Sequence, residues 1–377
     1  MMGDVHADPV TDIEHLLQRL LDRSLGGLAR ARVVDELAGW WDRSGGIAEP
    51  VLDRWLRDAV TALGRSGWRR TDVEQVVGTR APPPVRELAG ALESGVGPWR
   101  VRARLGAGAA VVRVVALRVF LGQLGSLPFV TEADAATGVA PVVLAKVRAL
   151  LAKAESTTFD AEADALVAKA HELMVRHAID RAVVDGGSRR GEVCARRVVV
   201  DDPYARAKFV LLSRVAQASS CQAVLSGAFG LATVFGYSGD LDAVEVLYTS
   251  LLLQATAGVA VARPCSPGSG SPAASTVAAF RRSWLLAFAH RIGERLEQAS
   301  THAVADAEIT HGRALAPVLA AKVEAVEAAM REAAPRLRSL RAMASSGDGW
   351  AAGRAAADRA TLAGQAPLPT RPPALER

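Results

Sequence analysis

The sequence predicts a mainly α-helical protein with an α+β C-terminal domain, and three observations lead to this fold class. Half of the 377 residues are apolar, but aromatic residues make up only 5%. The apolar set is mostly Ala, Val and Leu, which favours close-packed helices over an aromatic-rich sandwich. Apolar residues recur at helical spacing along most of the chain, and three short β-type runs interrupt this pattern after residue 190. We therefore expect helices throughout, with one small antiparallel sheet.

The N-terminal region, residues 1–140, is predicted to consist of successive helices. Two sets of apolar residues show the helical spacing: Ile13, Leu16, Leu17, Leu20 and Leu21, and then Val51, Leu52, Trp55 and Val60. Three consecutive prolines, Pro82, Pro83 and Pro84, cannot all lie inside a helix, so they break this region into two parts.

Residues 141–180 are predicted to form a helical hairpin, because two apolar stripes follow one another. The stripes are Val143, Val147, Leu150, Leu151 and Ala154, and then Leu166, Ala170, Leu173, Met174 and His177. Between them the segment "ESTTFD" supplies hydroxyl groups that can cap the second helix and an acid for its first turn. Two amphipathic helices joined by a short turn make an αα-hairpin.

The C-terminal domain, residues 190–363, is predicted to combine a three-stranded sheet with helices. Strands are expected at 196–200, 221–225 and 231–235, and the glycines of "SGAFG" suit a hairpin between the last two. Helices are then expected at 240–261, 274–299, 320–333 and 350–362. The Pro-rich residues 364–377 are expected to be a disordered tail.

The stretch "KAHELMVRHAID", residues 169–180, resembles the helix of a zinc protease at first sight. Such a helix needs histidines at positions i and i+4, which share one face, but position 175 is a valine. His171 and His177 are six residues apart and point in different directions. His177 lies within the apolar stripe, as a packing residue does, so we predict no metal site from this motif.

Other enzyme signatures are weak. The chain has no Walker A lysine motif, no dinucleotide fingerprint and no G-x-S-x-G elbow, so we expect no cofactor. A metal-dependent hydrolase stays an alternative if the hairpin gathers Glu155, Glu162 and His171 around an ion. Capping and solvation also explain the two carboxylates. Whether the protein is an enzyme is left open at this point.

Basic residues form the pattern that most favours a function. Lys146 and Lys153 are seven residues apart on one flank of the first stripe, and Lys169 and Arg176 are seven apart on the second. Downstream, Arg281 and Arg282 begin a series of further arginines: Arg291, Arg295, Arg336, Arg338, Arg341, Arg354 and Arg359. Such cations suit phosphate contact, although flanking residues that border a core have the same spacing. The net charge of +5 permits a nucleic-acid partner and does not require one.

Residues 145–180, "AKVRALLAKAESTTFDAEADALVAKAHELMVRHAID", closely resemble the bacterial and phage family called domain of unknown function 2786 (DUF2786). The hydroxyl-rich turn, the "ELM" and the closing "HAID" occur in register with the two stripes. The segments "VFGYSGDLDAVEVLYTSLL", "FRRSWLLAFAHRIGERL" and "AAGRAAADRA" look like the domain that usually follows it, and "SGWRRTDVEQVV" resembles a segment of actinobacterial members. The resemblance implies no catalytic residues, and its link with phages and mobile elements favours a nucleic-acid setting.

Together these features predict a cytoplasmic, non-enzymatic binding protein whose partner is DNA or RNA. Its contact residues would be Lys146, Lys153, Lys169, Arg176, Arg281 and Arg282. We expect a cytoplasmic location, because the three cysteines are widely spaced and the N-terminus is polar. We expect no membrane partner, because no convincing apolar span of about 20 residues is present. The remaining alternative is a protein-interaction module that docks a partner helix through Leu173 and Met174.

Overall fold

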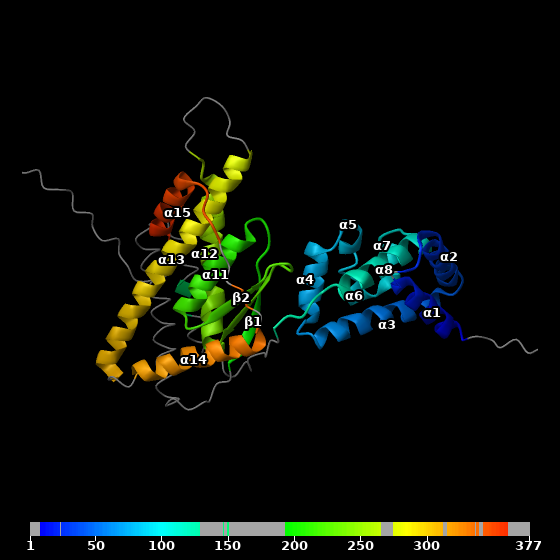
Figure 1. Cartoon of the computed structure of the whole chain (residues 1–377), viewed down its shortest axis with the longest axis horizontal. Helices are drawn as coiled ribbons and strands as arrows, with labels where there is room; N and C mark the ends of the chain where they lie inside the picture. The colour runs from blue at the N-terminus through cyan, green and yellow to red at the C-terminus, as the bar shows by residue number, and fades with distance from the viewer. Residues whose placement is uncertain are drawn as a thin grey trace, which may run out of the picture. The chain divides into compact units, whose positions relative to one another are not determined.

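A computed structural model describes residues 8–22, 24–128, 146, 149–150, 193–264, 274–311, 315–335, 337–338 and 342–360. The chain divides into two compact units, Met1–Phe129 and Val130–Arg377. Apart from residues 146 and 149–150, the predicted hairpin at 141–180 lies outside the described residues, as does the predicted tail. The predicted boundaries of the hairpin and of the C-terminal domain stay predictions. The chain is mainly helical with a small antiparallel sheet in its C-terminal half, as the sequence predicts (Figure 1).

The first unit is a bundle of helices, which confirms the prediction for this region. Its helices are α1 (Pro9–Leu21), α2 (Gly27–Arg43), α3 (Gly45–Gly64), α4 (Arg70–Arg80), α5 (Pro83–Arg86), α6 (Ala91–Ser94), α7 (Val96–Arg102) and α8 (Ala107–Gly122). The prolines end one helix and begin another, because α4 stops at Arg80 and α5 starts at Pro83. Leu17, Leu37 and Leu52 are fully buried and place the core between α1, α2 and α3.

Two carboxylates of α3 hold the start of α7. Asp53 accepts a hydrogen bond from the backbone N–H of Val96 at 2.8 Å, and the carboxylate of Glu49 lies over Gly97. A Cβ atom at Gly97 would stand 2.1 Å from an oxygen of Glu49, so only glycine fits there without displacing the acid. Asp53 thus satisfies one N–H group at the start of α7, and both carboxylates suit the positive end of the helix dipole.

The second unit combines a sheet with helices on both faces. Its elements are β1 (Cys194–Val199), α11 (Ala205–Ala218), β2 (Gln222–Ser226), β3 (Leu231–Gly236), α12 (Ser238–Val261), α13 (Ala274–His311), α14 (Leu315–Ala333) and α15 (Gly347–Arg359). The strand order is β1-β3-β2 and both pairings are antiparallel. All three predicted strands are confirmed, as is the hairpin, whose turn places Gly230 at φ 66°.

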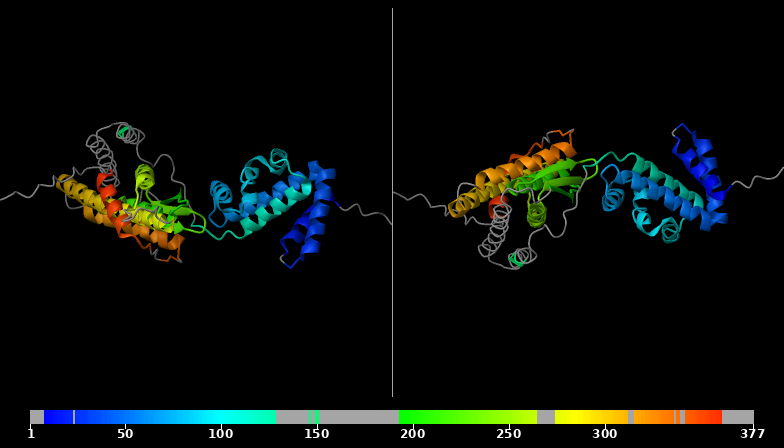
Figure 2. Two further views of the ribbon diagram at one scale, coloured as in Figure 1. Left: turned by 90° about the horizontal axis from the view of Figure 1, so that it is seen from above. Right: turned by 90° about the horizontal axis from the view of Figure 1, so that it is seen from below.

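Alternate residues of β3 face the two helical layers. Ala232 and Val234 belong to the main core with α11, α12 and α13, while Phe235 packs with Val326 of α14. Figure 2 shows α12 and α14 on opposite sides of the sheet. Gly236 at the end of β3 leaves room for the buried Sγ of Cys221, which would lie 2.4 Å from a Cβ there.

Two helices depart from the prediction. No helix is predicted at 205–218, but α11 forms there and buries Phe209, Leu212, Val215 and Ala216 at helical spacing. Its start lacks a side-chain cap and follows Tyr204 in a left-handed conformation, so the usual start signal is missing. The helix expected at 274–299 is also longer, because α13 continues to His311.

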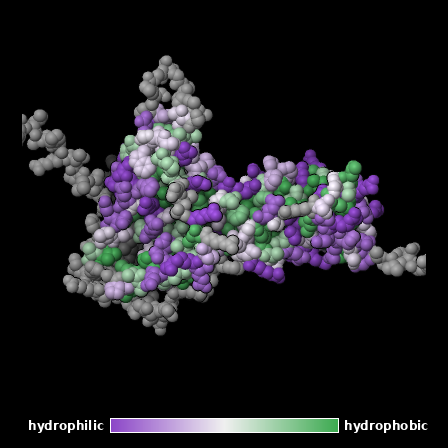
Figure 3. All heavy atoms as spheres, in the orientation of Figure 1, coloured by the Kyte–Doolittle hydropathy of each residue, from purple (hydrophilic) through white to green (hydrophobic). Residues whose placement is uncertain are grey.

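Helix α12 is the described helix whose length and apolar composition could also suit a membrane span. Within the second unit its Leu241, Val244, Leu247 and Leu251 are buried in the main core, while Leu253 and Val261 are exposed. The space-filling view shows hydrophilic and hydrophobic residues mixed on the visible face of both units (Figure 3). An exposed apolar residue is common on protein surfaces and carries no function by itself.

Helix α15 packs unusually close to α13, and glycines make this possible. A Cβ at Gly349 would stand 2.5 Å from the carbonyl oxygen of Phe280, and one at Gly353 would stand 2.2 Å from that of Trp284. Gly349, Gly353 and Ala357 are each four residues apart and buried, so they share the face that meets α13. The close approach brings the polar side chains at both edges of this contact within hydrogen-bonding distance.

Candidate nucleic-acid interface

The structure describes three of the six predicted basic residues. Lys146 is helical and exposed, while Lys153, Lys169 and Arg176 lie outside the described residues. Arg281 and Arg282 lie in the first third of α13. The basic ridge expected on the hairpin therefore stays a prediction, and the described part of the candidate interface consists of Arg281, Arg282 and their surroundings.

Arg282 is exposed and reaches the segment that leads into α15. Its Nη2 donates a hydrogen bond of 2.7 Å to the hydroxyl of Ser345. The next residue of α13, Ser283, is fully buried and accepts from the backbone N–H groups of Ser345 and Ser346 at 2.9 and 3.0 Å. Ser346 in turn caps α15 by accepting from the N–H of Gly349. We call Arg281, Arg282 and Ser345 the arginine corner.

Neither arginine of the corner forms an ion pair with any residue that the structure describes. The Nε of Arg281 is buried and has no hydrogen-bond acceptor among those residues. A guanidinium group carries five N–H donors and keeps its charge at every physiological pH. Among the described residues the two arginines therefore have no acidic partner, and the exposed guanidinium of Arg282 is the one that solvent, and so an oxyanion, can reach.

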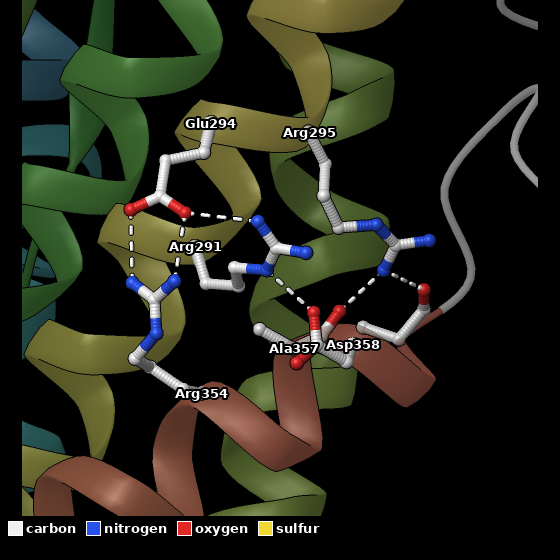
Figure 4. A network of polar contacts seen from close by, with 7 residues as sticks. Arg291, Glu294, Arg295, Arg354, Ala357 and Asp358 are labelled. Carbon is white, nitrogen blue, oxygen red and sulfur yellow. Dashed lines mark hydrogen bonds and ion pairs between the residues drawn. The ribbon is translucent and has the colours of Figure 1, made fainter. Parts of the chain in front are cut away.

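The arginines farther along α13 are engaged differently. Glu294 accepts two hydrogen bonds from Arg354 of α15, at 2.8 and 2.9 Å, and one from Arg291 at 2.9 Å (Figure 4). The Nε of Arg291 also donates to Asp358 of α15 at 2.5 Å. Two cations and two anions therefore alternate across the helix pair. The hydrogen bonds from Arg354 are the main reason why the pKa of Glu294 is lowered to about 2.

Arg295 caps the C-terminal end of α15. Its side chain is buried, and its Nη1 donates to the carbonyl oxygens of Ala357 and, at 2.6 Å, Ala360 (Figure 4). The carbonyl of Ala357 also accepts from the backbone N–H of Ala360 at 3.3 Å, and a cation beside these carbonyls suits the negative end of the helix dipole. Arg291, Arg295 and Arg354, which the sequence offered for phosphate contact, are thus used to join α13 to α15.

Charged residues near the sheet are also paired within the fold. Arg196 of β1 binds Asp242 and Glu245 of α12 at 2.8 and 2.6 Å. Lys322 of α14 lies 2.6 Å from Asp240 in the first turn of α12, and both side chains are largely buried. Burial raises the pKa of the nearby Cys221 thiol well above its usual value, which keeps it protonated and unreactive. These residues hold the helices to the sheet.

The structure offers no described cluster for acid-base or metal chemistry. Glu155, Glu162 and His171 lie outside the described residues, as do Leu173 and Met174 of the interaction alternative. Among the residues that are described, no group of three His, Cys, Asp or Glu side chains could hold a metal ion. Ser345 is a contact that the sequence does not predict, because no signal along the chain shows that it meets Arg282, 63 residues away.

Comparison with known proteins gives one finding. The model of the family described as "Protein of unknown function (DUF2786)" matches residues 142–181, the segment whose motifs the sequence showed. No curated protein and no solved structure matches the chain. The matched family has no assigned activity, so the match carries no function over to the arginine corner. The match identifies residues 142–181 as a DUF2786 segment, and it covers this part of the chain alone.

Proposed function

We propose that this protein binds the phosphate backbone of DNA or RNA, without catalysing a reaction, in the cytoplasm. The observation that carries the proposal is the arginine corner, where two neighbouring arginines have no acidic partner among the described residues. Arg291 and Arg354, on the same helix pair, are neutralised by Glu294 and Asp358. Arginines on one pair of helices thus differ in whether an acid neutralises them. The positive charge of the arginine corner therefore does not follow from a general excess of arginine in the sequence.

The chemistry of the corner fits a phosphodiester. Phosphate contacts in protein–nucleic acid complexes come from Arg and Lys, from hydroxyl groups and from backbone N–H groups. Arg282 and Ser345 provide the first two kinds at one place, and Arg281 is the preceding residue of the same helix. Lys146 and the predicted Lys153, Lys169 and Arg176 would extend the contact if the hairpin presents them on the same side. Contacts of this kind position a protein on the backbone and carry no sequence information.

The proposal is tested by measuring binding of labelled double- and single-stranded DNA and RNA by fluorescence anisotropy. We expect affinity that falls steeply between about 50 and 200 mM salt, because bound phosphates release counterions. Replacing Arg281 and Arg282 by Gln should weaken binding to every sequence and reduce the slope of log K against log salt by about one to two.

A matched control carries the same change of charge elsewhere in the second unit. Arg206 and Arg263 are exposed and form no ion pair with the residues that the structure describes, so the pair Arg206→Gln/Arg263→Gln should bind like the parent protein. Equal losses in both double variants would assign the effect to net charge. No retention on any of the nucleic acids at about 50 mM salt would remove the proposal.

A further inference from the structure

Helix α12 has an uncharged outer face. Between Glu245 and Arg263 its sequence contains no Asp, Glu, Lys or Arg. The inner residues of the helix lie in the main core of the second unit, whereas the residues on the opposite side are half-buried or exposed. Five apolar residues follow one another on that side at helical spacing: Val246, Leu253, Ala257, Ala260 and Val261. We call these five residues the outer stripe of α12.

The hydroxyl groups beside the outer stripe are occupied within the helix. Thr249 donates a hydrogen bond of 2.7 Å to the carbonyl oxygen of Glu245, and Thr256 donates one of 2.8 Å to that of Leu252. A core helix of this composition is mostly buried, but only 28% of an 18-residue window of α12 is. The outer stripe is therefore an apolar surface on which a further element can pack.

The predicted hairpin at 141–180 needs such a surface. The apolar stripe of a helix in a globular protein is about 100° wide or more, so two helices bury only the sides of their stripes that face each other. A chain of about 40 residues rarely holds a core by itself. The hairpin belongs to the second compact unit, Val130–Arg377, which also contains α12. The third surface that the hairpin needs is thus expected within this unit.

The chain that follows the hairpin keeps it within reach of α12. A stretch of about 12 residues, 181–192, separates the hairpin from the first described residue before β1 and spans roughly 40 Å when extended. Arg196 of β1 binds Asp242 and Glu245, so β1 lies beside the first turns of α12. The 24 residues of α12 have a length of about 36 Å. The hairpin can therefore reach every part of the outer stripe.

We propose that the DUF2786 hairpin packs on the outer stripe of α12, with Leu173 and Met174 of its second helix against Leu253. Both surfaces are apolar and repeat at helical spacing, so their contact removes both from water. A second copy of the chain or a membrane would also suit an apolar stripe. The tether favours the hairpin, because a short linker gives it an effective concentration in the millimolar range. This inference is independent of the proposed nucleic-acid function.

Thiol labelling of the full-length protein tests the packing. Leu253→Cys is made in a Cys265→Ser protein, whose remaining native thiols, Cys194 and Cys221, are buried. Met343→Cys in the same background is the reference, since the side chains at 253 and 343 are 60% and 78% exposed and should react alike without the hairpin. We expect a maleimide to react at least about tenfold more slowly at 253, because the hairpin must open first. Equal rates would overturn the proposal.

Changes in the hairpin distinguish this occupant from any other. Leu173→Asp/Met174→Asp should raise the labelling rate at 253 to the rate at 343, because charged side chains cannot stay against the outer stripe. His171→Asp is the matched control, since His171 lies off the apolar stripe of the hairpin, and labelling at 253 should stay slow in this variant. Slow labelling at 253 that persists in Leu173→Asp/Met174→Asp would assign the protection to a second copy or another partner and refute the proposal.

The reciprocal change is read out in the hairpin itself. Leu253→Asp/Ala257→Asp alters two exposed positions, so the described fold should tolerate it. We expect peptides within residues 142–181 to lose protection in hydrogen exchange measured by mass spectrometry. Met343→Asp adds a charge at an exposed apolar position outside α12 and should leave these peptides unchanged. Equal protection of residues 142–181 in the parent protein and in Leu253→Asp/Ala257→Asp would contradict the packing.

Discussion

Replacing Gly353 by Ala should destabilise the second unit, although Ala is normally the better helix former. At this position a Cβ would stand 2.2 Å from the carbonyl oxygen of Trp284, whereas ordinary contact begins at 3.4 Å. The obstacle is backbone, which cannot rotate away, so α15 must move by about 1 Å from α13. Overpacking of this kind costs about 1–3 kcal/mol, and a further loss comes from the stretched hydrogen bonds between Arg354 and Glu294.

The gain in helix propensity from Gly to Ala offsets about 1 kcal/mol. We therefore expect a net loss of about 2 kcal/mol in the free energy of unfolding. Thermal unfolding followed by calorimetry should show it as a fall in Tm of about 2–4 °C per kcal/mol. Gly64→Ala is the control, because this helical glycine has nothing within 4 Å of its Cβ position. A Gly353→Ala protein as stable as the parent would refute the close packing of α15 on α13.

Three further predictions concern charges and the first unit. The pKa of Glu294 is lowered to about 2 in the folded state. Its contribution to the stability of the fold is therefore present above pH 4.5, its ordinary pKa, and is lost as the pH falls from 4.5 toward 2. Because this side chain is 43% exposed, Glu294→Gln should lower the free energy of unfolding by at most about 1 kcal/mol at pH 7. Between pH 4.5 and 2 the urea midpoint of this variant should depend less on pH than that of the parent protein. Burial and the guanidinium of Arg214, 3.2 Å from the ring, lower the pKa of His290, so stability should fall as the pH drops below its ordinary 6.5, and His290→Asn should lack this loss in the same titration. Gly97→Ala should displace Glu49 from the start of α7 and lower the free energy of unfolding, measured by chemical denaturation, by about 1–2 kcal/mol, whereas an equally stable variant would contradict this close contact.

Local patterns along the chain predicted much of the fold. The strands at 196–200, 221–225 and 231–235 correspond to β1, β2 and β3, because β-branched and apolar runs bounded by glycine are a local signal. The helices of the first unit follow from apolar spacing in the same way. Helix α11 was missed because its cap is absent and its apolar residues follow a strand closely. The DUF2786 segment could be identified because its motif is contiguous.

The candidate site was only half accessible to sequence reasoning. Arg281 and Arg282 stand out as neighbouring cations, but their sequence context resembles that of Arg291 and Arg354. What separates the two pairs is the presence of acids from another helix. Glu294 and Arg354 are 60 residues apart, and no local pattern along the chain shows that they meet in the folded protein.

By itself the sequence determined the helical class, the three strands, the break at the prolines and the DUF2786 segment, since each depends on residues that are close in the chain. Only the tertiary structure decided which arginines are neutralised, where Ser345 lies and what His290 contacts. The physical reason is that Gly349 and Gly353 let α15 approach the backbone of α13 closely. That approach pairs Arg291 and Arg354 with acids and leaves the arginine corner positively charged.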